Sequence, residues 1–279
     1  MKDLNEQLFE ACGRGNIEEV ESLIKKGADV NVSYTNGNTP LMVPSYYGYT
    51  EIVQLLINEG ANVNASLYNF DTALIRACRK NNIKIVKLLI DAGADVNANC
   101  RFNTSIDYND CCTALMFASE NGNTQIAKLL IDAGADVNHD GSLVKNLYHY
   151  ENNNITKIRR TALIKSVNEG YVEITKLLIK SGADLEICTE NGFNALMHAA
   201  YRLWNMDRYR AWSMGYLEGI TSCKKISTDI KNKKNYIEII KLLIKSGANI
   251  NFEEAWMRFG NSYNPDIKLL ENFIKGEFK

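Results

Sequence analysis

Two kinds of apolar segment alternate along the chain with a regular spacing. The first is short and follows the tripeptide Thr-Pro-Leu, Thr-Ala-Leu or Asn-Ala-Leu. These markers begin at Thr39, Thr72, Thr113, Thr161 and Asn194. The second segment has apolar residues three and four apart, as at Ile85, Leu88 and Leu89, and it ends at Gly-Ala-Asp or Gly-Ala-Asn. This spacing predicts amphipathic helices, so the pattern indicates a repeated unit of helix, turn, helix and hairpin.

The repeat has a period of 33 residues. The glycines of the second marker are Gly27, Gly60, Gly93, Gly134, Gly182 and Gly247. Insertions of 8, 15 and 32 residues lengthen the later spacings. One helix pair cannot bury both of its apolar faces alone, so we expect the units to stack into a solenoid.

Local signals support this unit. The residues Thr39, Thr72, Thr113 and Thr161 suit a helix N-cap, and Pro40 suits the first helical position. The predicted turns between the two helices contain residues that tolerate the left-handed region, namely Gly15, Gly48, Asn81, Gly122, Gly170 and Asn235. One position of the first helix carries small residues, which are Cys12, Ser45, Cys78, Ser119, Val167 and Ala200. Small side chains at this position predict a close approach of neighbouring helices.

The segments Gly37–Asn64 (GNTPLMVPSYYGYTEIVQLLINEGANVN) and Asp71–Asn97 (DTALIRACRKNNIKIVKLLIDAGADVN) carry the pattern most clearly. They resemble the ankyrin repeat. The resemblance implies an all-α repeat solenoid with β-hairpin fingers, whose fingers and first helices line a groove that binds other proteins. The histidine of the family's Thr-Pro-Leu-His motif is absent. Its positions are occupied by Met42, Ile75, Met116, Ile164 and Met197. Pro44 falls inside a predicted first helix, where it predicts a local bend.

From this resemblance we expect a single ankyrin-repeat domain across residues 1–279, with about six repeats. The predicted repeats are 4–34, 35–67, 68–100, 110–140, 158–189 and 190–251, the last of which contains an insertion at 203–234. Residues 252–279 are predicted to form a degenerate C-terminal cap of two helices, because terminal repeats need a polar outer face.

The insertions are candidates for a special function. Cys100–Cys112 and Asp140–Arg160 are predicted to be lengthened hairpin fingers. The third insertion is predicted to extend the first helix to about Leu217 and to turn before Asn235. It either presents a surface to a partner or folds back as a plug, and an exposed Trp212 would favour the first alternative.

Charge is distributed unevenly along the chain. The net charge is −1, but residues 1–140 carry −7 and residues 141–279 carry +6. No export signal or apolar stretch long enough for a membrane span is visible, and the seven cysteines show no paired spacing. We therefore expect a cytoplasmic monomer with reduced thiols and no contact with a membrane.

The sequence gives little support for catalysis. His139, His149 and His198 are far apart, and the cysteines near His139 do not have the spacing of a zinc site. We expect no catalytic residue, no metal and no cofactor.

The main hypothesis is a non-enzymatic protein–protein interaction module, acting as a scaffold, adaptor or inhibitor. Its partner-binding residues are predicted on the fingers, on the first helices and in the 203–234 insertion. They are Tyr34, Tyr46, Tyr47, Tyr68, Arg79, Lys80, Phe102, Tyr108, Tyr148, Tyr150, Tyr201, Arg202 and Trp212. The second hypothesis is a nucleic-acid contact through the basic C-terminal half, where arginines and aromatic residues are interleaved. Nucleic acid is the less expected partner, because lysine-rich helix faces are usually only solvated.

Overall fold

The computed structural model describes residues 3–34, 37–66, 71–101, 111–141, 160–189, 192–203 and 223–249, together with Gly276. The chain divides into two compact units, residues 1–136 and residues 137–279. The elements of the first unit are α1 (Leu4–Arg14), α2 (Ile17–Lys25), α3 (Met42–Tyr47), α4 (Thr50–Asn58), α5 (Ala73–Arg79), α6 (Ile83–Asp91), β1 (Asn99–Arg101), β2 (Cys111–Thr113), α7 (Ala114–Glu120) and α8 (Thr124–Asp132). The second unit contains α9 (Ala162–Asn168), α10 (Val172–Lys180), a helix at 195–203 and α12 (Cys223–Lys245). The predicted cap at 252–279 lies outside the described residues except for Gly276.

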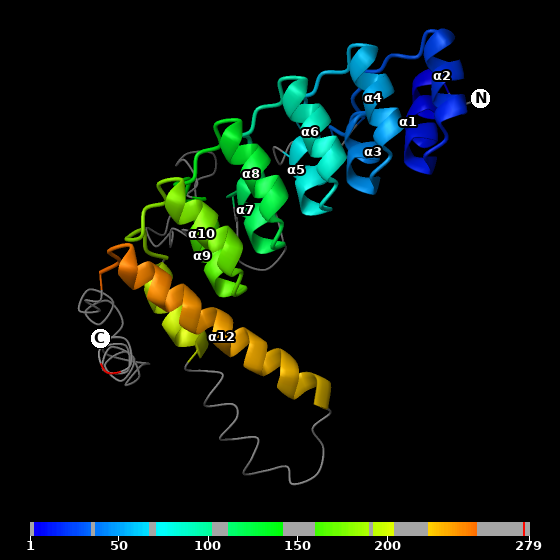
Figure 1. Ribbon diagram of the computed structural model, residues 1–279. Coiled ribbons are helices and arrows are strands. Elements are labelled where there is room, and N and C mark those ends of the chain that lie inside the picture. Colours follow the sequence, from blue (N-terminus) through cyan, green and yellow to red (C-terminus); the bar gives the residue numbers. More distant parts are fainter. Residues whose placement is uncertain are drawn as a thin grey trace, which may run out of the picture. The chain divides into compact units, whose positions relative to one another are not determined.

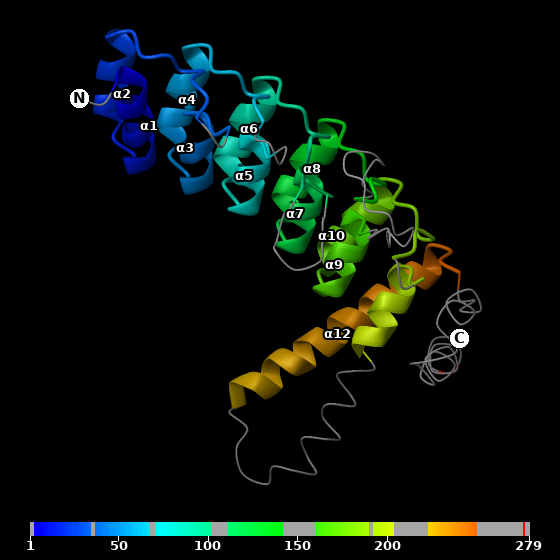
Figure 2. The same ribbon diagram turned by 180° about the vertical axis from the view of Figure 1, so that it is seen from behind.

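The first unit is a row of helix pairs that follow one another in chain order (Figures 1 and 2). Each second helix has nine residues, and the first helices α3, α5 and α7 are shorter than this, whereas α1 has 11 residues. The second helices bury two or three residues of one stripe, such as Ile85, Val86 and Leu89 in α6. The predicted small residues of the first helices, Cys12, Ser45, Cys78, Ser119, Val167 and Ala200, are all completely buried. The small-residue column was therefore correctly predicted from the sequence.

The predicted threonine caps form in three of four repeats. The hydroxyls of Thr72, Thr113 and Thr161 accept the backbone N–H three residues later at 3.2–3.3 Å. Thr39 is the exception, because α3 begins only at Met42 and the Thr39 hydroxyl has no hydrogen-bond partner among the described residues. Pro44 explains the late start of α3. It has no N–H to donate to the carbonyl of residue 40, so the first α-helical hydrogen bond of α3 runs from Ser45 N–H to the Leu41 carbonyl, at 3.3 Å.

The turns between paired helices use a left-handed residue, as predicted, at Gly15, Gly48, Asn81, Gly122 and Gly170. The prediction was wrong at Asn235, which lies within the continuous helix α12. The segment before Asn235, KKISTDIKNKK, contains no glycine or proline, and its polar residues are compatible with a solvated helix. The second half of the insertion thus lengthens the second helix of its repeat. In both views α12 runs beside the helix at 195–203 (Figures 1 and 2).

Asparagine amides connect the helix ends of successive repeats. Asn82 Nδ2 donates to the carbonyls of Ser45 and Tyr46 at the end of α3, at 2.9 and 3.1 Å. Asn121 Nδ2 does the same at the end of α5, and Asn235 Nδ2 donates to the carbonyl of Gly170 at 3.1 Å. The last carbonyls of a helix have no partner within the helix, so these amides stabilise the stacking of one pair on the next.

Strands β1 and β2 form an antiparallel pair in which Cys100 is opposite Cys112. The side chains of both cysteines are buried, and both are free thiols. The segment that joins the strands lies outside the described residues, as does most of the finger predicted at 140–160. Among the residues that are described, we find no helix of the length and apolar character that a membrane span requires.

Candidate functional site

The structure brings four of the predicted contact residues together at one place. Tyr46 and Tyr47 end α3, and Arg79 and Lys80 lie at the end of α5. Three of them border a pocket of about 300 Å³, which we call the α3–α5 pocket. Its lining residues are Asn38, Val43, Tyr46, Tyr47, Asp71, Arg76 and Arg79. The predicted contacts Tyr68, Phe102, Tyr108, Tyr148, Tyr150 and Trp212 lie outside the described residues.

A buried carboxylate organises the cationic side of the pocket. Only 5% of the Asp71 side chain is exposed. Arg76 Nε donates to Asp71 Oδ2 at 3.0 Å, and Arg79 Nη2 lies 3.6 Å from Asp71 Oδ1. Arg76 Nη2 also donates to Asn38 Oδ1 at 2.7 Å. One carboxylate therefore holds two guanidinium groups in place, and the second of them is one turn along the same helix face.

The other side of the pocket is aromatic. Tyr46 and Tyr47 meet edge to face with ring centroids 5.2 Å apart, and Tyr47 stacks on Tyr49 at 5.9 Å. Lys80 Nζ lies 4.5 Å from the Tyr46 ring centroid, and a hydrogen bond with Lys80 lowers the pKa of the Tyr46 hydroxyl. Tyr47 is 60% exposed, so most of its ring is accessible to another molecule.

Arg79 extends the surface towards the next repeat. Its Cζ atom lies 4.9 Å from the centroid of the buried Phe117 ring on α7. This geometry is a cation–π contact, which restricts the guanidinium group further. Rings and cations therefore alternate across α3, α5 and α7.

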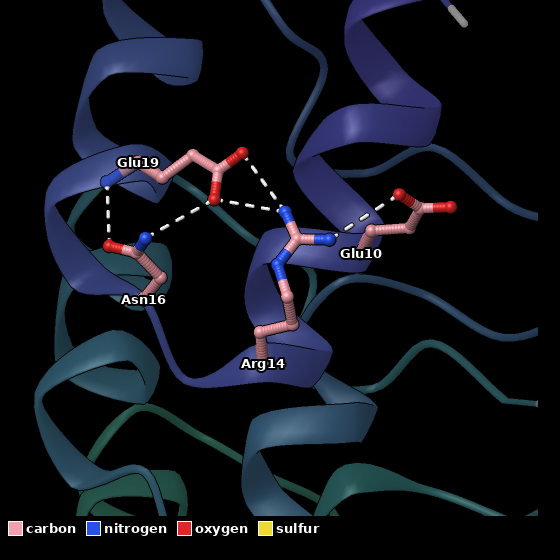
Figure 3. Close-up of polar contacts among 4 residues, drawn as sticks. All are labelled: Glu10, Arg14, Asn16 and Glu19. Carbon is pink, nitrogen blue, oxygen red and sulfur yellow. Dashed lines mark hydrogen bonds and ion pairs between the residues drawn. The ribbon is translucent and has the colours of Figure 1, made fainter.

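The surface changes character in the first repeat, where Arg14 occupies the position of Tyr47. Arg14 Nη2 donates to both carboxylate oxygens of Glu19 at 2.9 Å, and Nη1 donates to Glu10 at 3.4 Å (Figure 3). Asn16 caps α2 by accepting the Glu19 N–H at 3.1 Å. The hydrogen bond with Glu19 raises the pKa of Arg14. Arg14 thus pairs with two carboxylates of its own repeat, whereas Arg76 and Arg79 share the carboxylate of Asp71.

Tyr34, another predicted contact residue, packs inside the first unit. Its ring lies on Phe9 with centroids 4.4 Å apart, and its hydroxyl oxygen is buried without a hydrogen-bond partner among the described residues. Burial raises the pKa of Tyr34 to about 12. Tyr34 is half-buried and packs on Phe9, and its contact with a partner stays a prediction.

The second unit carries a smaller group of the same residue types on the helix at 195–203. Tyr201, which occupies the Tyr46 position of its repeat, and Arg202 are exposed. The Tyr201 and Phe193 ring centroids are 6.0 Å apart. His198 packs edge to face on Phe193 at 5.7 Å, and its Nε2 lies 3.3 Å from Thr189 Oγ1. Burial, with smaller contributions from Arg202 and Arg160, lowers the pKa of His198 to about 4.

Cys12, Cys78, Cys100 and Cys112 are buried free thiols, and none of them lines the α3–α5 pocket. Within the part of the chain that the structure describes, no three His, Cys, Asp or Glu residues gather as a metal site requires. Burial raises the pKa of Cys12 and of Cys100 to about 12, so these thiols are protonated at neutral pH and are weak nucleophiles. The pocket instead offers guanidinium donors beside accessible rings.

Sequence reasoning missed Asn38, Val43, Asp71 and Arg76 as pocket residues. Arg76 could have been found, because it lies three residues before Arg79 on a predicted helix. Asp71 gave no such signal, since an acidic residue before a threonine cap is common at a helix start.

Comparison with known proteins agrees with the repeated architecture. A family model described as ankyrin repeats (3 copies) matches the chain three times, at residues 8–100, 66–140 and 138–207. A search of the curated proteins found no match.

Proposed function

Because the chain belongs to the ankyrin-repeat family, we propose that it is a non-enzymatic scaffold, adaptor or inhibitor that binds a protein partner. Ankyrin repeats are generally protein–protein interaction modules, and the family is typically non-enzymatic. In this proposal the repeats form a single domain with a C-terminal cap, and the partner lies along the first helices and the fingers.

The exposed ring of Tyr47 is the observation that carries this proposal. A tyrosine that is 60% exposed contributes little to a core, yet it stands beside Tyr46, Arg79 and Lys80. Tyrosine and arginine are enriched among the residues that dominate binding energy in protein interfaces. The position therefore suits contact with a partner better than it suits folding.

Affinity purification on the immobilised full chain, followed by mass spectrometry, tests the proposal. The comparison is with a variant that combines Tyr47→Ala and Trp212→Ala. We expect a protein retained by the wild type to bind the variant at least about tenfold more weakly. The melting temperature should fall by no more than about 3 °C, because the Tyr47 side chain is mostly exposed and Trp212 is proposed to contact the partner and not the core.

Two outcomes would count against it. Equal retention by both proteins would show that the partner does not use these residues. A large fall in melting temperature would assign Tyr47 or Trp212 to packing.

A nucleic-acid contact by the C-terminal half is the alternative. In the described part of that half, Lys176 Nζ pairs with Glu173 at 3.0 Å and with Glu238 at 2.8 Å, which reduces the positive charge available to phosphates. Fluorescence anisotropy with labelled single-stranded RNA and duplex DNA over a salt series separates the alternatives. Binding that weakens steeply with salt would support the nucleic-acid contact, and no binding at low salt would exclude it.

A further inference from the structure

We infer that the α3–α5 pocket binds an acidic side chain of a partner protein, within a peptide segment that also places an apolar or aromatic residue on Tyr47. This inference rests on the proposed function and specifies the chemistry of the partner. The charge of the pocket, its rigidity, its size and its aromatic rim support it.

The local charge of the pocket is opposite to that of its surroundings. Arg76 and Arg79 bring two positive charges against the single negative charge of Asp71, and Lys80 adds a third positive charge at the edge. Residues 1–140 as a whole carry a net charge of −7. The negative charge of residues 1–140 therefore repels an acidic segment from most of their surface, and the α3–α5 pocket attracts it. This difference favours docking of the segment at the pocket.

The guanidinium groups are held in place by the protein itself. Asp71 and Asn38 fix Arg76 through two hydrogen bonds, which use two of its five N–H donors. Arg79 is fixed between Asp71 and the Phe117 ring. A carboxylate can bind such a group without first ordering a long side chain, so less entropy is lost on binding.

The size and charge of the pocket match one carboxylate. A volume of about 300 Å³ is at the lower limit for ligand sites and is enough for one or two side chains. The lining residues have a net charge of +1, from two arginines and one aspartate. A carboxylate neutralises this charge, whereas a phosphate dianion would place excess negative charge near Asp71.

The rim of the pocket supplies the apolar contact. Tyr46 and Tyr47 form one wall, and the Tyr47 ring is the more accessible of the two. Their rings and the charged groups lie around one pocket, so an acidic residue inside it brings its sequence neighbour close to Tyr47. The preferred segment therefore combines Asp or Glu with an adjacent Phe, Tyr, Leu or Ile.

Selection from a phage-displayed library of random peptides, with the full chain immobilised, tests the inference. We expect the selected peptides to be enriched in an acidic residue next to an apolar or aromatic one. The best peptide is then synthesised with a fluorescent label, and its Kd is measured by anisotropy. Replacing its acidic residue by the corresponding amide should raise the Kd about tenfold, because a charge-assisted hydrogen bond is lost.

Matched variants locate the binding site. Tyr47→Ala should raise the Kd about tenfold, and Lys80→Gln about threefold, since Lys80 lies at the exposed edge. The controls are Lys87→Gln, an exposed lysine on α6 outside the pocket lining, and Tyr171→Ala, an exposed tyrosine of the second unit. Both should leave the Kd unchanged. Thermal denaturation shows that each variant is folded.

The remaining outcomes separate this inference from the proposed function. Selected peptides that lack acidic residues would overturn the inference. So would peptides whose Kd is changed by neither Tyr47→Ala nor Lys80→Gln. In either case the protein would be a binding module that uses another surface. Tighter binding when phosphoserine replaces the acidic residue would also overturn it, in favour of a phosphorylated partner. If no peptide is selected, the inference is wrong, and affinity purification decides on the proposed function independently.

Discussion

Asn64 connects its own loop to that of the next repeat at Asp95. Its Oδ1 accepts the backbone N–H of Asp95 at 2.8 Å, while its Nδ2 donates to the carbonyl of Gly93 at 3.0 Å. The same two bonds recur at Asn31, Asn97 and Asn138. At Glu186 only the acceptor bond remains, to the N–H of Asn249 at 2.7 Å, because a carboxylate cannot donate to a carbonyl. An asparagine ladder thus couples successive loops within each unit.

Asn97→Ala is expected to destabilise the first unit by about 1–2 kcal/mol, because it removes both bonds of one ladder step and each contributes about 0.5–1.5 kcal/mol. Urea denaturation measures the change. The control is Asn58→Ala, an exposed asparagine bonded to Gln54 within its own helix, which should cost less than about 0.5 kcal/mol. An equal loss in both variants would show that the ladder does not stabilise the stack.

Asp71→Ala is expected to cost about 2 kcal/mol of stability, because it leaves Arg76 and Arg79 close together without the carboxylate that they share. The free energy of unfolding from denaturant titration measures this loss. Asp91→Ala, at the exposed end of α6, provides the control and should cost less than about 0.5 kcal/mol. If the two aspartates proved equivalent, Asp71 would not organise the pocket.

Gly15→Ala is expected to destabilise the first unit more than Gly27→Ala does. Both glycines have positive φ, +75° and +94°, so both variants incur about 1 kcal/mol of backbone strain. A Cβ at Gly15 would also lie 2.8 Å from the Tyr49 ring, whereas at Gly27 nothing lies within 4 Å. The additional loss at Gly15, about 1–2 kcal/mol by denaturation, measures the clash. Equal losses would mean that the Tyr49 ring moves without cost.

Sequence reasoning succeeded where the signal is local or strictly repeated. The caps at Thr72, Thr113 and Thr161 and the buried column that includes Cys12 and Cys78 could be predicted, because each depends on a residue type at a fixed repeat position. Stacking requires these features in nearly every unit, so they persist despite the insertions.

Prediction failed where the outcome depends on one departure from the repeat. Asn235 occupies a turn position, but the helix-compatible residues before it allow α12 to continue through it. Asp71 and Asn38 meet at Arg76 only because α3 stacks beside α5, which brings together residues from different repeats. The pocket is therefore a product of stacking, and no short motif in the sequence encodes it.

The stability of the second unit should vary with pH because of His198. The folded structure lowers the pKa of His198 to about 4, mainly by burial and then by the charges of Arg202 and Arg160. Its ring contacts the Phe193 ring and the Thr189 hydroxyl, and neither group is a counter-charge. In the unfolded chain the pKa is about 6.5. Between these values the unfolded chain binds a proton that the folded chain does not, so stability is complete above about pH 6.5 and is lost as the pH falls towards 4.

His198→Gln removes this titration and should make the second unit less sensitive to acid. Between pH 7 and pH 5 the wild type should lose about 1–2 kcal/mol more than the variant, a figure that allows for the partial exposure of the His198 side chain. Urea denaturation of both proteins at the two pH values gives this double difference, in which the titration of the acidic residues common to both proteins cancels. Parallel losses in the two proteins would show that His198 titrates in the folded state as it does in the unfolded chain. The Phe193 and Thr189 contacts would then leave the ring open to solvent.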